Sequence, residues 1–192
     1  MSKESRIANV EFRALDNDEN KMIIEGYAIT FNTPATHWGM TEIISERALD
    51  NCDMSDVPLK YNHDDSHLIM ARTRNGSLQL EKDSVGLKIR AELVDTQSNQ
   101  DIYKSIKSGL LDKMSFAFTV KEENYDFDTD TRTILNIDKL YDVSVVDTPY
   151  YDSTSVFARK LDNSQEYVEK RNMEKRKKLA EKLARIELLD RL

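Results

Sequence analysis

Runs in which apolar and polar residues alternate dominate the first 160 residues of the chain. Such alternation puts every second side chain on the same face of an extended strand, so that one face packs on a core and the other meets water. Residues 77–81 and 86–93 show it most clearly and predict an antiparallel hairpin. Alternation or a richness in strand-forming residues predicts further strands at 7–15, 22–31, 41–44, 58–63, 113–120, 132–137, 139–146 and 154–158.

Helical spacing replaces this alternation in two segments. Ile102 and Ile106 are spaced as on one face of a helix, and Gly109 follows where a helix end is expected. We therefore predict a helix at 99–108. A second, shorter helix is predicted at 46–51, because the serine before it is a residue type that caps helix N-termini.

The C-terminal segment differs in composition from the rest. Residues 165–192 contain neither proline nor glycine and are rich in charged helix formers. Apolar residues recur there at intervals of three or four: Leu179, Leu183, Ile186 and Leu189. This predicts a charged helix that either packs its narrow apolar stripe on a partner or remains a solvated tail. We accordingly divide the chain into a folded domain at 1–160 and a helical tail at 161–192.

Composition and charge narrow the class of protein. The 192 residues are 39% hydrophobic and 33% charged, which suits one globular domain with a polar extension. Residues 1–160 hold 19 Lys and Arg against 28 Asp and Glu, a net charge of −9, whereas residues 161–192 hold 9 against 7. An acidic body argues against a nucleic-acid partner, which requires clustered positive charge.

The single cysteine, Cys52, excludes an intrachain disulfide and favours a reducing compartment. The first residues are charged and lack an apolar signal core, and no run approaches the roughly 20 apolar residues of a membrane span. We expect a soluble protein without a membrane partner.

Ser115 is a hydroxyl between large apolar residues in a predicted strand. Such a serine is most often a packing residue, but a catalytic nucleophile must also be held rigidly by its surroundings. A serine becomes reactive only when a base takes its proton, and the chain offers three histidines, His37, His63 and His67. His63 is favoured because it ends a predicted strand in a polar turn, where an imidazole stays accessible.

The third candidate is a carboxylate that orients the imidazole. Asp142 and Asp147 flank a short valine-rich strand. On a strand Asp142 shares a face with Ser144, while the intervening valines point to the other face. Asp147 stands at the strand end before Thr148 and a proline, where turn capping is the ordinary role. Asp142 is therefore the better candidate.

Six blocks of the sequence, in this order, resemble the prohead maturation proteases of tailed bacteriophages. They are EGYA at 25–28, LKYNHD at 59–64, ARTRNGSL at 71–78, DSVGL at 83–87, MSFAF at 114–118 and LYDVSVVDTP at 140–149. Each block alone is weak, but their shared order makes the resemblance specific. It covers roughly residues 20–160.

The resemblance implies an α+β fold with a mainly antiparallel, β-barrel-like core surrounded by helices, similar to herpesvirus assemblins. It also implies a serine endopeptidase with Ser115 as nucleophile and His63 as general base. The family commonly has glutamate at the position of Asp142, so this chain keeps the carboxylate on a shorter side chain. Asp147 is an alternative third member, and the second histidine of the assemblins would point to His37 or His67.

The resemblance further implies where and on what the protein acts. Enzymes of this family are enclosed in the assembling prohead in the host cytoplasm, where they cut internal scaffold, the scaffold-like N-terminal part of the capsid protein and often themselves. The tail at 161–192 would dock the enzyme in the prohead or be removed by self-processing. Capsid protein and scaffold are the expected partners, with self-association also open, and no cofactor is expected.

Two other classes remain open. A metal-dependent hydrolase is an alternative because residues 63–67 contain two histidines and two aspartates, although the segment reads as a turn and lacks the His-Glu-x-x-His pattern. A non-catalytic capsid scaffold or assembly module is the other alternative. It would explain the charged helix but not the contexts of Ser115, His63 and Asp142.

Overall fold

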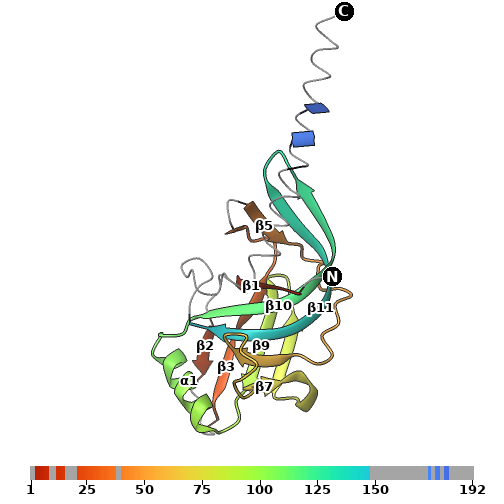
Figure 1. Cartoon of the computed structure of the whole chain (residues 1–192). Helices are drawn as coiled ribbons and strands as arrows, with labels where there is room; N and C mark the ends of the chain where they lie inside the picture. Colours follow the sequence, from red (N-terminus) through yellow and green to blue (C-terminus); the bar gives the residue numbers. More distant parts are fainter. Residues whose placement is uncertain are drawn as a thin grey trace, which may run out of the picture. The chain divides into compact units, whose positions relative to one another are not determined.

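The computed structural model describes residues 3–8, 12–15, 21–37 and 40–147 (Figure 1). It also describes five helical positions in the C-terminal segment: Met173, Arg176, Lys177, Ala180 and Glu181. The chain divides into two compact units, and the unit formed by 1–125 and 130–152 carries both sheets. The strand expected at 154–158 and the boundary expected near residue 160 lie outside the described residues, as does most of the expected helical tail.

The larger sheet has seven strands and is mixed. Its main path runs in the order β1 (Lys3–Ala8), β10 (Lys113–Asp126), β11 (Thr131–Val146), β5 (Met40–Ile44) and β4 (Ala35–His37). Beside this path, β6 (Pro58–Tyr61) pairs with β11, and β7 (Ala71–Arg72) pairs with β6. The pairings of β11 with β5 and with β6 are parallel, whereas β1 with β10, β4 with β5 and β6 with β7 are antiparallel. Strand β11 is thus the centre on which β10 and β6 converge.

The second sheet has four antiparallel strands. Their order is β2 (Phe12–Leu15), β3 (Ile23–Thr30), β9 (Gly86–Glu92) and β8 (Leu78–Lys82). The hairpin predicted from the alternation is confirmed as β8 and β9. The first residue of β9 is Gly86. A Cβ at this position would lie 1.9 Å from the carbonyl oxygen of Ile29, so no larger residue fits.

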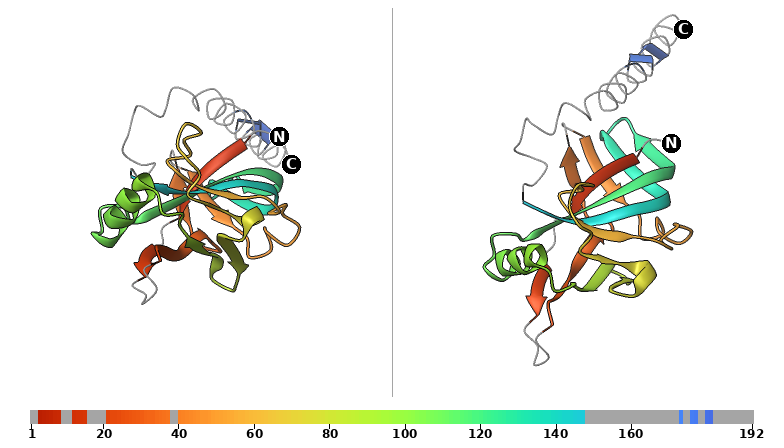
Figure 2. Two further views of the ribbon diagram at one scale, coloured as in Figure 1. Left: turned by 90° about the horizontal axis from the view of Figure 1, so that it is seen from below. Right: turned by 60° about the horizontal axis from the view of Figure 1, so that its bottom comes forward.

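Helix α1 (Gln97–Lys107) confirms the helix predicted at 99–108. Thr96 caps it, since its side chain accepts a hydrogen bond from the backbone of Asn99. Ile102 and Ile106 are buried, and the helix lies beside β2 (Figure 2). Gly109 follows with a φ of +75°, a conformation that glycine adopts at little cost.

The expected barrel with surrounding helices is wrong for the described part of the chain. Closing a barrel requires the edge strands to pair. In the described residues β1 and β4 end one sheet and β2 and β8 end the other, and neither sheet closes. The only α-helix among the elements of the described domain is α1, accompanied by a short 3-10 turn, η1 (Thr73–Asn75).

The helix predicted at 46–51 is also wrong. The Ser45 hydroxyl does accept a hydrogen bond from the backbone of Arg47, as a cap would. The backbone bonds that follow, from Ala48 to Ser45 and from Asp50 to Arg47, span three residues and form successive turns. A helix propagates only when bonds spanning four residues follow its first turn. Here the chain instead enters a bridge from Asp53 to β11.

Strands β10 and β11 are longer than predicted. The strand expected at 113–120 continues to Asp126, and the two strands expected at 132–137 and 139–146 form one strand. Residues 121–124 are exposed and polar, so they carry no sign of a buried face. In a paired hairpin such residues extend a strand through backbone hydrogen bonds, which no hydrophobic pattern reveals.

Candidate active site

A strained turn directs His63. The backbone N–H of Asp64 donates to the carbonyl of Tyr61 at 3.0 Å, and the two central residues, Asn62 and His63, have φ values of 53° and 55°. Two consecutive positive φ values define a type I′ turn, which favours asparagine and glycine but not histidine. The left-handed backbone conformation of His63 lowers the stability of the fold by about 1–2 kcal/mol, and such strain is typical of functional sites.

Contacts to the end of β11 hold this turn in place. The Asn62 backbone N–H donates to the carbonyl of Val145 at 2.9 Å. The Asn62 side-chain oxygen accepts from the backbone of Asp147 at 3.1 Å. Because β6 is already paired with β11 through Leu59 and Val143, the imidazole is carried directly to the face of β11.

Ser115 and Asp142 come from the two strands at the centre of the larger sheet. Ser115 lies on β10 and has 2% of its surface exposed, and its neighbours Phe116 and Phe118 are buried with their rings stacked on each other. Asp142 lies on β11 and is fully buried. Side chains on packed strands have few rotamers, so both groups are held rigidly.

The structure brings His63 between these two side chains. Its Nε2 lies 2.6 Å from the Ser115 Oγ, and its Nδ1 is hydrogen-bonded to Oδ1 of Asp142. We assign the Nδ1–H tautomer, because Nδ1–H then donates to the carboxylate and Nε2 remains free to accept a proton. The three groups form one continuous chain of hydrogen bonds.

Asp142 is ionised although it is buried. Burial raises the pKa of its carboxyl, but the hydrogen bond and charge of His63 and the charge of Lys3 outweigh this, and the pKa falls to about 2. The Lys3 Nζ lies 3.2 Å from Oδ2, on the side of the carboxylate away from the histidine. The site therefore presents a negative charge to the imidazole at neutral pH.

Strand β1 covers Ser115. It runs antiparallel to β10 with Ile7 opposite Ser115, and the carbonyl oxygen of Arg6 lies 2.7 Å from the Ser115 Oγ. A hydroxyl has one proton, so Ser115 donates either to this carbonyl or to His63. The Arg6 carbonyl thus competes with the imidazole for the proton.

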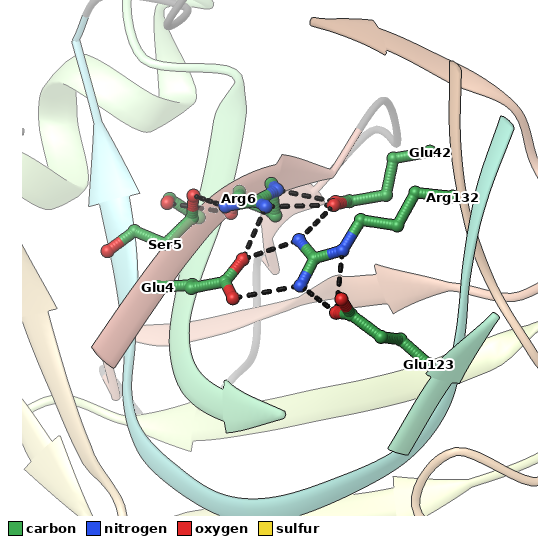
Figure 3. Close-up of polar contacts among 7 residues, drawn as sticks. Glu4, Ser5, Arg6, Glu42, Glu123 and Arg132 are labelled. Atoms are coloured by element: carbon green, nitrogen blue, oxygen red, sulfur yellow. Dashed lines mark hydrogen bonds and ion pairs between the residues drawn. The ribbon is translucent and has the colours of Figure 1, made fainter. Parts of the chain in front are cut away.

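Buried charges fasten β1 in this position (Figure 3). The guanidinium of Arg132 on β11 pairs with Glu4 at 2.7 Å, and the guanidinium of Arg6 also pairs with Glu4, at 2.6 Å. Both arginines also bind Glu42 on β5, and Arg132 further binds Glu123 on β10. Arg132 and Glu42 are 4% and 3% exposed. Burial raises the pKa of Glu42, but the two arginines lower it more strongly.

The other expected side chains lie elsewhere. Asp147 is exposed and accepts a hydrogen bond from the Tyr61 hydroxyl at 3.0 Å. His67 is exposed and packs edge-to-face on the Tyr61 ring, with centroids 5.7 Å apart. His37 belongs to β4, but its side chain is outside the described part of the structure.

Sequence reasoning missed three groups around this site. Lys3 and Arg6 come from a strand more than 100 residues away in sequence, and no local pattern marks them. Ser144 was noted only for sharing a face with Asp142. Its Oγ lies 3.0 Å from Asp142 Oδ1 and 3.1 Å from His63 Nδ1. The signal that could have identified Ser144 is its position two residues after Asp142 on a predicted strand, which places both side chains on one face.

Within the described ranges no group of three or more His, Cys, Asp and Glu side chains is arranged to hold a metal ion. None of the helices described there is long and apolar enough to cross a membrane.

Comparison with known proteins assigns the chain to a family. Residues 8–168 match the model of the caudovirus prohead serine proteases, and the chain belongs to this family. The protein thus belongs to the class of serine proteases that act in phage capsid maturation. Such proteases act in the assembling capsid within the host.

A solved structure, the bacteriophage T4 capsid assembly protease gp21, is similar over 76% of this chain and 99% of its own, with 11% sequence identity and a TM-score of 0.43. No curated protein sequence matches the chain significantly.

Proposed function

We propose that the protein is a serine endopeptidase in which Ser115 is the nucleophile, His63 the general base and Asp142 the group that orients His63. The observation that carries this proposal is the chain of hydrogen bonds from Ser115 Oγ through both ring nitrogens of His63 to Asp142. A buried serine with no chemical task would not require a strained histidine and a buried charge beside it.

Catalysis follows from this arrangement. The Ser115 Oγ attacks a peptide carbonyl carbon while its proton passes to His63 Nε2. The tetrahedral intermediate collapses when His63 returns the proton to the leaving amine, which yields an acyl-enzyme. Water then attacks the acyl group by the same proton path and releases Ser115. Asp142 stabilises the imidazolium that forms in each half of the reaction.

The proposed substrates are the internal scaffold and the scaffold-like N-terminal part of the capsid protein, inside the assembling prohead. Membership of the caudovirus prohead serine protease family supports this. The proposed chemistry needs neither a cofactor nor a metal ion, because the nucleophile, base and orienting carboxylate are all side chains.

Self-cleavage is part of the proposal, and β1 is the segment that supports it. The Arg6 carbonyl already lies within hydrogen-bond distance of Ser115, on a strand that runs antiparallel to β10. If β1 is a substrate, the wild-type protein will lose residues up to about Arg6, and Ser115→Ala will keep them. Intact-mass measurement of both proteins after prolonged incubation tests this, and an unchanged wild-type mass would exclude β1 as a substrate.

A fluorophosphonate probe tests the proposed nucleophile without knowledge of the cleavage site. The Ser115 Oγ forms a bond to phosphorus, fluoride leaves, and the proton passes to His63. We expect labelling of the wild type and none of Ser115→Ala or His63→Ala. Thr119→Val is the matched control, because it removes another buried hydroxyl from β10 and should leave labelling unchanged. Because β1 covers Ser115, an unlabelled wild type favours a non-catalytic assembly protein if a variant without residues 1–8 is also unlabelled.

A further inference from the structure

Ser144 lies between Asp142 and His63, two of the three residues of the proposed mechanism. It lies on β11 two positions after Asp142, so both side chains share a face of the strand. Its exposed surface is 0%, as is that of the flanking residues Val143 and Val145. A hydroxyl so deeply buried costs about 1–3 kcal/mol if it lacks a hydrogen-bond partner.

The partners of the Ser144 hydroxyl all belong to the candidate site. Its Oγ lies 3.0 Å from Asp142 Oδ1 and 3.1 Å from His63 Nδ1, and it accepts the His63 backbone N–H at 3.3 Å. In the assigned tautomer Nδ1 carries a proton and cannot accept another. The single proton of Ser144 therefore goes to Asp142, and its lone pairs face His63.

Ser144 thus binds the two residues in different ways. It donates to the oxygen of Asp142 that also accepts from His63, which restricts rotation of the carboxylate. It also accepts from the backbone of His63, at the centre of the strained turn. Loss of the hydroxyl would leave this N–H without its bond and the carboxylate held by His63 and Lys3 alone.

We propose that Ser144 is a positioning residue that holds Asp142 and the His63 turn in register for proton transfer from Ser115. The inference rests on the proposed function of that site. It adds a fourth side chain to the proposed site. Ser144 touches neither the substrate nor the reacting atoms and acts through Asp142 and His63. A serine that only filled space beside two valines would not influence the orientation of Asp142 or His63.

The primary test is the rate at which a fluorophosphonate labels Ser115 in Ser144→Ala. Hydrogen bonds to charged groups are strong enough that we expect labelling to slow roughly 10- to 100-fold. Ser144→Thr retains the hydroxyl and should recover much of the rate. The control is again Thr119→Val, which removes a buried hydroxyl on β10 and should label at the wild-type rate.

A spectroscopic readout separates positioning from packing. The Nδ1–H proton of a histidine bound to a carboxylate gives a distinct low-field proton resonance. We expect this resonance to shift or broaden in Ser144→Ala and to remain in Ser144→Thr and Thr119→Val. A packing role alone would lower stability in Ser144→Ala without changing the resonance.

The outcomes distinguish this inference from the proposed function. If the wild type is labelled but folded Ser144→Ala labels at the same rate with an unchanged resonance, the positioning role is overturned and the nucleophile assignment stands. If neither the wild type nor a variant without residues 1–8 is labelled, the proposed function itself fails. Should Ser144→Ala not fold, Ser144→Cys provides the comparison, because a thiol fills the site but is a weak donor. An undiminished rate in Ser144→Cys would overturn the inference.

Discussion

At the scale of single residues, the site combines an ionised aspartate with complete burial. Asp142 accepts hydrogen bonds from His63, Ser144 and Lys3, which together replace its lost hydration. The short aspartate side chain reaches the imidazole because the turn at Asn62 and His63 is itself bonded to β11. The carboxylate of Asp142, one methylene shorter than that of a glutamate, therefore meets the imidazole.

Replacing Asp142 with asparagine tests the orienting role. Asp142→Asn keeps the volume but removes the charge and favours the wrong tautomer of His63, so we expect labelling and peptide cleavage to fall roughly 10³- to 10⁴-fold. Asp142→Glu restores the carboxylate and should retain more activity than Asp142→Asn. Equal activity of the wild type and Asp142→Asn would contradict this role.

Asp142 should also make stability depend on acidity. Its pKa is lowered from 3.8 to about 2 by folding, so its contribution is complete above the unfolded value and is lost as the pH falls toward 2. The shift corresponds to about 2 kcal/mol. Urea unfolding at a series of pH values should show the wild type losing this amount more than Asp142→Asn between about pH 4 and pH 2. Parallel losses in the two proteins would argue against it.

At the scale of elements, β1 is joined to the sheet by more than backbone pairing. Glu4 and Arg6 extend from it into a cluster with Glu42, Glu123 and Arg132, in which each charge has at least one opposite partner. A buried charge cluster of this kind contributes little net stability when complete but is costly when broken. It therefore specifies where β1 lies.

Removing one member of the cluster should expose this cost. Arg132→Met leaves three glutamates with Arg6 as the one remaining arginine of this largely buried cluster, and we expect the free energy of unfolding to fall by about 3–5 kcal/mol. Arg90→Met is the control, because Arg90 pairs with Glu25 across β9 and β3 on a solvent-facing side of the second sheet, where a pair is worth about 0–1 kcal/mol. Similar losses in both variants by urea unfolding would refute the difference.

At the scale of the whole molecule, local elements are predictable from sequence and the assembly of the sheets is not. The hairpin of β8 and β9 and helix α1 follow from periodicity because their hydrogen bonds join near neighbours in sequence. The parallel pairing of β6 with β11 joins residues more than 80 positions apart, and no periodicity encodes it. The expected barrel was wrong for the described strands for the same reason, since closure depends on such distant pairings.

The candidate site shows the same division. Ser115, His63 and Asp142 stand out by residue type, local context and family resemblance, and the structure brings them within hydrogen-bond distance. Their catalytic roles stay predictions. Lys3 and Arg6 carry no local signal, because their place at the site depends on the pairing of β1 with β10.

The convergence of β10 and β6 on β11 has a consequence for heat inactivation. Ser115 and Asp142 lie within strands, and the turn of His63 is bonded to the end of β11, so the sheet itself holds all three side chains. Labelling by the fluorophosphonate should therefore disappear over the same temperature range as the circular dichroism of the sheets. Loss of labelling well below that range would mean that the His63 turn opens independently.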